Sequence, residues 1–136
     1  MYLLDTNILS ELIKKHPSPS VLSQLGTKPA NTLFTSCICI MELRFGSVLR
    51  EDAEIFWEKI TQEIISRLNI VPIAKREALS AGNILAELRK KGESMGLEDV
   101  LIAASALANQ YIVVTANIRH FTRIKGLKVE NWLEAV

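Results

Sequence analysis

Tyr2-Leu-Leu-Asp5 and, one residue later, Asn7-Ile-Leu-Ser-Glu-Leu-Ile-Lys-Lys15 read as a short apolar strand followed by a helix. The strand ends in a carboxylate, and the apolar residues after Asn7 recur at helical spacing. A strand followed at once by a helix is the repeating unit of α/β proteins with parallel sheets. The start of the chain therefore predicts a fold of that class.

The same alternation of strand and helix continues to the end of the chain. Strands are predicted near residues 32–35, 70–73, 111–115 and 127–130, and helices near residues 20–25, 37–45, 52–68, 76–91 and 99–108. Thr35 or Ser36 is expected to cap the third helix. With right-handed crossovers, this order predicts an α/β/α sandwich around a central, mostly parallel sheet of about five strands. We expect residues 1–136 to form a single domain.

Composition narrows the class of protein. The hydrophobic fraction is 49% and the mean hydropathy is +0.19, which indicates a well-filled interior and argues against disorder. No apolar run approaches the ~20 residues needed to span a bilayer, and no signal peptide is recognisable, so we expect a soluble cytoplasmic protein. Cys37 and Cys39 share one apolar segment and are expected to be core residues, neither disulfide partners nor zinc ligands.

Three acidic residues are tied to apolar segments. Asp5 ends the first strand, Asp99 begins the last long helix, and Glu42 interrupts the apolar run 37–45. Ligands of open parallel sheets gather beyond the carboxyl ends of the strands, where residues 115–117 also lie. Neighbouring carboxylates raise each other's pKa unless a cation binds them. Oxygen ligands without suitable Cys or His favour Mg²⁺ or Mn²⁺.

Each acid also has a simpler explanation. Asp5 and Asp99 could be N-caps of the helices that follow them. Glu42 could be the partner of an arginine such as Arg44 or Arg76. The three acids together favour a cation site.

A basic stretch occupies the end of the chain. Residues 100–129 contain no acidic side chain but do contain Arg119, Arg123, Lys125 and Lys128. A solvated surface and a contact with nucleic acid both fit this pattern.

Four segments, in this order, resemble the motifs of PIN domains, in particular those of the VapC and FitB toxins of type II toxin–antitoxin pairs. The segments are Leu4-Asp-Thr-Asn-Ile-Leu-Ser-Glu-Leu12, Met41-Glu-Leu-Arg-Phe-Gly46, Asp99-Val-Leu-Ile-Ala-Ala104 and Val113-Val-Thr-Ala-Asn-Ile-Arg-His-Phe121. The resemblance spans the whole chain. It implies a PIN-like fold and a Mg²⁺- or Mn²⁺-dependent endoribonuclease toxin. It also implies a homodimer, inhibition by a cognate antitoxin, and contact with operator DNA only through that antitoxin.

The resemblance also assigns residues. Asp5, Glu42 and Asp99 match the core acids that hold the metal, and Thr6 and Asn7 match the polar pair beside the first acid. An acid often found near Asn117, or at the position of His120, is missing here, which puts a second metal in doubt. Glu98 could substitute for it, although its position at a helix start is expected to face solvent.

We accordingly predict metal-assisted hydrolysis of RNA phosphodiester bonds. The predicted catalytic residues are Asp5, Glu42, Asp99 and Asn117, and the predicted substrate contacts are Thr6, Asn7, Thr115, Arg119 and Arg123. Two other classes remain. A phosphoacceptor signalling domain would need an acidic pair after the first strand, an aspartate that ends a middle strand and a late lysine, and none of these is found here. A non-catalytic PIN-like module that binds RNA or protein is favoured only by the missing fourth acid.

Apolar helical faces raise the question of partners. The 52–68 helix carries Phe56, Trp57, Ile60 and Ile64 on one stripe. Core packing is the simpler explanation for this stripe, and a partner-binding face is the alternative.

Overall fold

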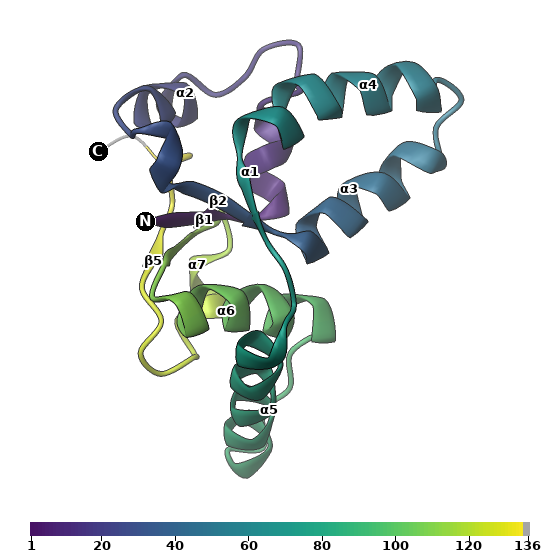
Figure 1. Ribbon diagram of the computed structural model, residues 1–136. Coiled ribbons are helices and arrows are strands. Elements are labelled where there is room, and N and C mark those ends of the chain that lie inside the picture. Colours follow the sequence, from purple (N-terminus) through teal and green to yellow (C-terminus); the bar gives the residue numbers. More distant parts are fainter. Residues whose placement is uncertain (135–136) are drawn as a thin grey trace.

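A computed structural model describes residues 1–134 and contains one five-stranded sheet (Figure 1). The strands are β1 (Tyr2–Leu4), β2 (Leu33–Ser36), β3 (Asn69–Val71), β4 (Ile112–Val114) and β5 (Val129–Glu130). They lie in the order β3-β2-β1-β4-β5, and all four neighbouring pairs are parallel. The predicted α/β class is confirmed, and the sheet is wholly parallel.

Helices lie on both sides of this sheet. The α-helices are α1 (Thr6–Glu11), α2 (Pro19–Gly26), α3 (Cys37–Val48), α4 (Ala53–Glu63), α5 (Lys75–Lys90), α6 (Leu97–Asn109) and α7 (Ile118–Phe121), and the 3₁₀ helices are η1 (Ala30–Thr32) and η2 (Ile65–Arg67). In Figure 1, α1 and α2 lie above the sheet and α5 and α6 below it, while α3 and α4 form a hairpin that extends beyond the carboxyl ends of the strands.

The core is centred on β1 and β4. Leu3, Leu4, Val113 and Val114 have no exposed surface, as expected for the central strands of a parallel sheet that is covered on both faces. Ala103, Ala104 and Ala106 of α6 are also fully buried, and their small side chains let this helix lie close to the sheet. No helix within residues 1–134 is long and apolar enough to cross a bilayer.

Three predicted helix limits were wrong. The first helix ends at Glu11 instead of Lys15, because the Glu11 carboxylate accepts a hydrogen bond from the Ser18 backbone N–H (3.1 Å) and the chain turns back. The predicted 52–68 helix is broken after Glu63, where Ile64 leaves helical dihedral angles and is fully buried. The last long helix begins at Leu97, so Asp99 lies inside its first turn.

The apolar stripe of α4 packs mainly into the core. Ile60 and Ile64 are fully buried, and Phe56 and Trp57 are half-buried against the core, which supports the simpler explanation. Cys39 is buried and Cys37 half-buried, and both are free thiols. The short helix α7 was not predicted, since four residues carry too little periodicity to be recognised.

Candidate active site

Asp5 stands where β1 meets β4. Leu4 pairs with Val114 across the two strands, so the next residues, Asp5 and Thr115, lie side by side at the carboxyl edge of the sheet. The Thr115 hydroxyl donates to Asp5 Oδ2 (2.9 Å) and the Thr6 backbone N–H donates to Oδ1 (2.8 Å). Asp5 is also the N-cap of α1 and is only 6% exposed. Asp5 is therefore both the N-cap of α1 and a member of the acid cluster.

Asn7 joins the start of α1 to the turn after β4. Its side-chain N–H donates to Asp5 Oδ2 (3.2 Å), and its carbonyl oxygen accepts from the Ala116 backbone N–H (3.0 Å). The Thr115 hydroxyl also accepts from the backbone N–H of Asn117 (3.0 Å). These bonds hold the first acid in place, because the side chains of Asn7 and Thr115 are themselves held by the backbone of the turn after β4.

Glu42 reaches the same place from α3. The Thr6 hydroxyl donates to Glu42 Oε1 (2.8 Å), so α1 links the two carboxylates. The alternative pairing with an arginine is wrong: Arg44 lies over the Trp57 ring, 4.8 Å from its centroid, and Arg76 donates to the Ala108 carbonyl oxygen. Glu42 is half-buried, so it lines the edge of the core.

Cys39 completes a tight cluster that sequence reasoning missed. One ligand atom from each of Asp5, Glu42 and Cys39 lies within 4.8 Å of the other two. Burial raises the pKa of the Cys39 thiol to about 12, so the thiol is neutral and forms a wall of the site. Cys39 precedes Glu42 by three residues on one helix, and this spacing could have revealed their proximity.

Asp99 faces this cluster from α6. The N-cap of α6 is Gly96, so the capping explanation for Asp99 is wrong. Burial raises the pKa of Asp5, and repulsion from Asp99 raises it further, although the hydrogen bond from Thr115 opposes the shift. The pKa of Glu42 is also raised by burial, and then by the charges of Asp5, Asp99 and Glu98. Negative charge thus gathers here, and within residues 1–134 no basic side chain pairs with Asp5 or Glu42.

A pocket of about 530 Å³ opens beside Glu42. Its lining residues are Thr6, Met41, Glu42, Phe45 and Glu98. Glu98 was expected to face solvent; it is exposed, and it also lines this pocket. One wall of the pocket is therefore acidic and another is apolar.

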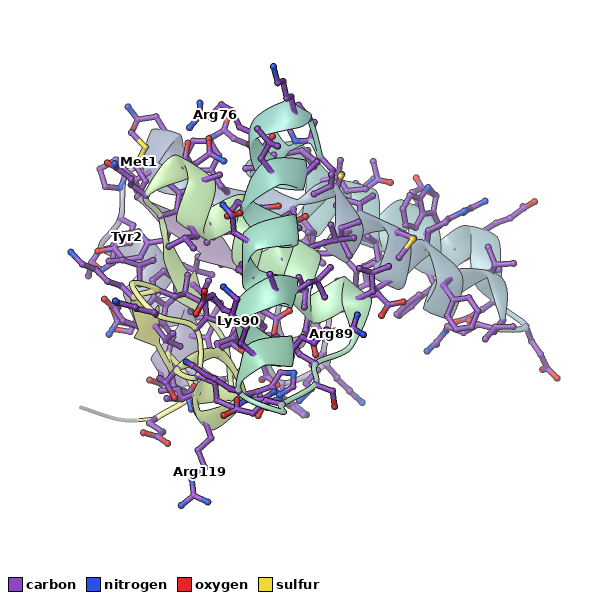
Figure 2. The ribbon with its side chains drawn as sticks, turned by 90° about the horizontal axis from the view of Figure 1, so that it is seen from below. Met1, Tyr2, Arg76, Arg89, Lys90 and Arg119 are labelled. Atoms are coloured by element: carbon purple, nitrogen blue, oxygen red, sulfur yellow. The ribbon has the colours of Figure 1, made fainter. Side chains whose placement is uncertain are left out.

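The other predicted residues are not gathered in the same way. Asn117 is exposed at the N-cap position of α7, and its side chain makes no capping bond. Arg119 is exposed and points away from the body of the protein (Figure 2). Arg123 instead donates to the carbonyl oxygens of Ser94 and His120.

This geometry was compared with known proteins. The sequence profile of the PIN domain matches residues 2–127. The chain belongs to the PIN-domain family. The matched range of this PIN domain includes Asp5, Glu42 and Asp99 and the strands β1 to β4. Strand β5 lies just beyond it.

Individual relatives match this PIN domain over nearly its full length. Ribonuclease VapC2 of Haemophilus influenzae is 37% identical over 132 residues, which are 97% of this chain and 98% of the relative. The tRNA(fMet)-specific endonuclease VapC of Salmonella typhimurium is 31% identical and covers 96% of this chain and 97% of its own. A chain in the crystal structure of VapBC2 from Rickettsia felis, bound to a promoter DNA fragment, is 35% identical with a TM-score of 0.88, covering 96% and 98% of the two chains. These matches confirm the resemblance and the PIN-like fold.

Proposed function

We propose that this PIN domain is the toxin of a toxin–antitoxin pair and acts as a metal-dependent endoribonuclease. The proposal is supported by the clustering of Asp5 and Glu42 and by the raised pKa of both, which burial raises first and the charge of Asp99 raises further. The full-length similarity to proteins named as VapC ribonucleases supports the same activity.

The donor set fits Mg²⁺ or Mn²⁺. Hydrogen bonds within residues 1–134 leave Glu42 Oε2 and Asp99 Oδ1 without a donor, so each carboxylate keeps an oxygen for a cation. Carboxylate oxygens suit these hard ions, and the neutral Cys39 thiol is not needed as a ligand. A bound cation would relieve the repulsion, lower the pKa of a bound water and stabilise charge on the phosphoryl oxygens.

The remaining predicted residues receive supporting roles. Thr6, Asn7 and Thr115 orient Asp5 and Glu42 through the hydrogen bonds described above, and they border the place where a phosphate would bind. Asn117, at the exposed turn after β4, is placed to hold water or phosphate. The exposed Arg119 supplies positive charge for the RNA backbone, and Arg123 adds charge from its fixed position.

We propose an antitoxin as the partner of the apolar side of α3. Met41 is 50% exposed and Phe45 is 69% exposed, and both line the acidic pocket with Glu42. An amphipathic antitoxin helix could place its apolar face here and direct a basic side chain toward Glu42, in competition with the metal. The Rickettsia relative was crystallised as a VapBC complex on promoter DNA, so we propose that DNA contact is made through the antitoxin.

The nuclease proposal is tested by Asp5→Asn. Loss of this metal ligand should weaken cation binding. With less cation to offset the negative charge on the phosphate in the transition state, Mg²⁺-dependent cleavage of a tRNA pool should fall at least about 100-fold. The matched control is Asp52→Asn, since Asp52 is an exposed aspartate paired with Arg50 in the turn after α3. Thermal melting of both variants shows that they are folded.

Wild-type cleavage rates from Asp5→Asn would refute the site assignment. A wild-type protein that binds RNA with Mg²⁺ present and never cleaves it would instead favour the non-catalytic module.

A further inference from the structure

His120 is the hydrogen-bonding neighbour of Asp99. Its Nε2 lies 2.8 Å from Asp99 Oδ2, so α7 contacts the first turn of α6 through this pair. The other ring nitrogen, Nδ1, lies 3.2 Å from a guanidinium nitrogen of Arg123. Both partners are partly shielded, with 24% of the His120 side chain and 36% of the Asp99 side chain exposed.

Asp99 and Arg123 together decide which ring nitrogen carries the proton. A guanidinium group has only donors, so Nδ1 of His120 must accept. A carboxylate oxygen can only accept, so the proton on Nε2 is donated to Asp99 Oδ2. The same arginine donates from Nε to the His120 carbonyl oxygen (3.3 Å), so it holds the residue by both its ring and its backbone.

Arg123 is itself anchored to the loop before α6. Both terminal guanidinium nitrogens donate to the Ser94 carbonyl oxygen at 3.2 Å, and Glu93 pairs with the group at 3.6 Å. This loop leads directly into the helix that carries Asp99. The arrangement is therefore closed, from Asp99 through His120 and Arg123 back to the loop that precedes α6.

We propose that His120 is a positioning residue for Asp99, and that Arg123 on Nδ1 reinforces the Nε2–H tautomer that the Asp99 carboxylate requires. The Nε2–H donor fixes Oδ2, and within residues 1–134 Oδ1 accepts no hydrogen bond, so it stays open to a cation. Hydrogen bonds to ligating carboxylates are a general means of orienting metal ligands. The proposal rests on the proposed function, because Asp99 matters here as a ligand.

Two substitutions separate hydrogen-bond donation from mere bulk. In His120→Gln the amide nitrogen takes the place of Nε2 and can reach Asp99, whereas in His120→Asn the shorter amide takes the place of Nδ1 and cannot. The readouts are the rise in melting temperature on adding Mn²⁺ and the Mn²⁺ concentration that gives half-maximal cleavage. We expect His120→Asn to raise that concentration by about 10-fold or more and to reduce the melting shift, and His120→Gln to stay near wild type.

A third measurement observes the tautomer without metal. The chain has two histidines, so His16→Gln leaves His120 as the single imidazole. Nitrogen-15 NMR of that protein at about pH 8, where histidine is ordinarily neutral, should show a proton on Nε2. Adding Asp99→Ala together with Arg123→Met removes both contacts that fix the tautomer, and the fraction of rings with the proton on Nε2 should then fall.

The possible outcomes distinguish the positioning role of His120 from the proposed metal site on which that role depends. Equal Mn²⁺ responses in wild type, His120→Gln and His120→Asn would overturn the role of His120 while leaving the metal site intact. Equal losses in both variants, or a predominant Nδ1–H tautomer, would overturn it as well. A wild-type protein with no Mn²⁺ response would refute the metal site, and the positioning role with it.

Discussion

Asp5 carries a carboxylate that is nearly buried and still accepts three side-chain or backbone hydrogen bonds. Those bonds, from Thr115, Thr6 and Asn7, favour the charged form, but burial outweighs them and the charge of Asp99 adds to its effect, so the pKa of Asp5 is raised. A charge held in such a place is costly for the metal-free protein. The same cost favours binding of a cation.

This cost predicts a pH dependence of the metal-free protein. A folded-state pKa above the ordinary 3.8 means that the contribution of Asp5 to stability is fully present below about pH 3.8 and is lost as the pH rises through the folded value. Asp5→Asn has no such loss. The melting temperature of Asp5→Asn in EDTA should therefore gain on that of wild type as the pH is raised from about 3.8 to neutrality. A difference in melting temperature between wild type and Asp5→Asn that stays constant across that pH range would contradict the raised pKa of Asp5.

At the level of elements, α3 decides which apolar surface is left uncovered. The helix begins after the N-cap Ser36, whose hydroxyl accepts from the Ile38 backbone N–H (3.1 Å), and it buries Cys39, Leu43 and Ser47. Its other side is also apolar and is exposed at Met41, Phe45, Val48 and Leu49. Such an exposed apolar patch indicates an interface.

Truncation of that patch should weaken antitoxin binding. Phe45→Ala should reduce the affinity of the cognate antitoxin about tenfold or more, because large central apolar side chains dominate interfaces of this kind. Leu22→Ala is the control, since Leu22 is an exposed leucine of α2. Titration calorimetry with the purified antitoxin measures both variants. Equal affinities would place the antitoxin on another surface.

At the level of the whole molecule, the cluster draws on segments far apart in the chain, since the end of β1, α3 and α6 each contribute one acid. A cation that binds all three should bind the folded chain and not the unfolded one. An ion at about 100 times its dissociation constant adds about 2.7 kcal/mol to the free energy of unfolding.

Mg²⁺ or Mn²⁺ should accordingly raise the melting temperature by several degrees, as this free energy implies for a domain of this size. The shift should shrink strongly in Glu42→Gln, which keeps the size of the side chain and removes its charge. Differential scanning fluorimetry with EDTA or Mn²⁺ measures both proteins. Identical wild-type curves under the two conditions would exclude a cation site at these acids.

We also propose a homodimer. The outer surface of α5, which extends from the body in Figure 1, exposes Leu79 and Leu85. Sedimentation of the isolated chain at micromolar concentration should give about 30 kDa, twice the chain mass of 15.2 kDa. A strict monomer would remove the dimer and leave the nuclease proposal intact.

Much of this protein could be read from local patterns in its sequence. Short apolar strands alternating with amphipathic helices predicted the α/β class, because periodicity and burial are properties of neighbouring residues. The place of Asp5 at the end of the first strand followed from the same pattern, as did the presence of Asp99 near a helix start. Their assignment as metal ligands came from the PIN resemblance and stays a prediction.

Other features depended on how distant elements pack. The strand order places β4 beside β1, and only this neighbourhood makes Thr115 a partner of Asp5. Both sides of α3 are apolar, so periodicity could not decide which side would be buried and which would face a partner. The bond from His120 to Asp99 joins residues 21 positions apart through the packing of α7 against α6, and no spacing rule within one helix or strand could have predicted it.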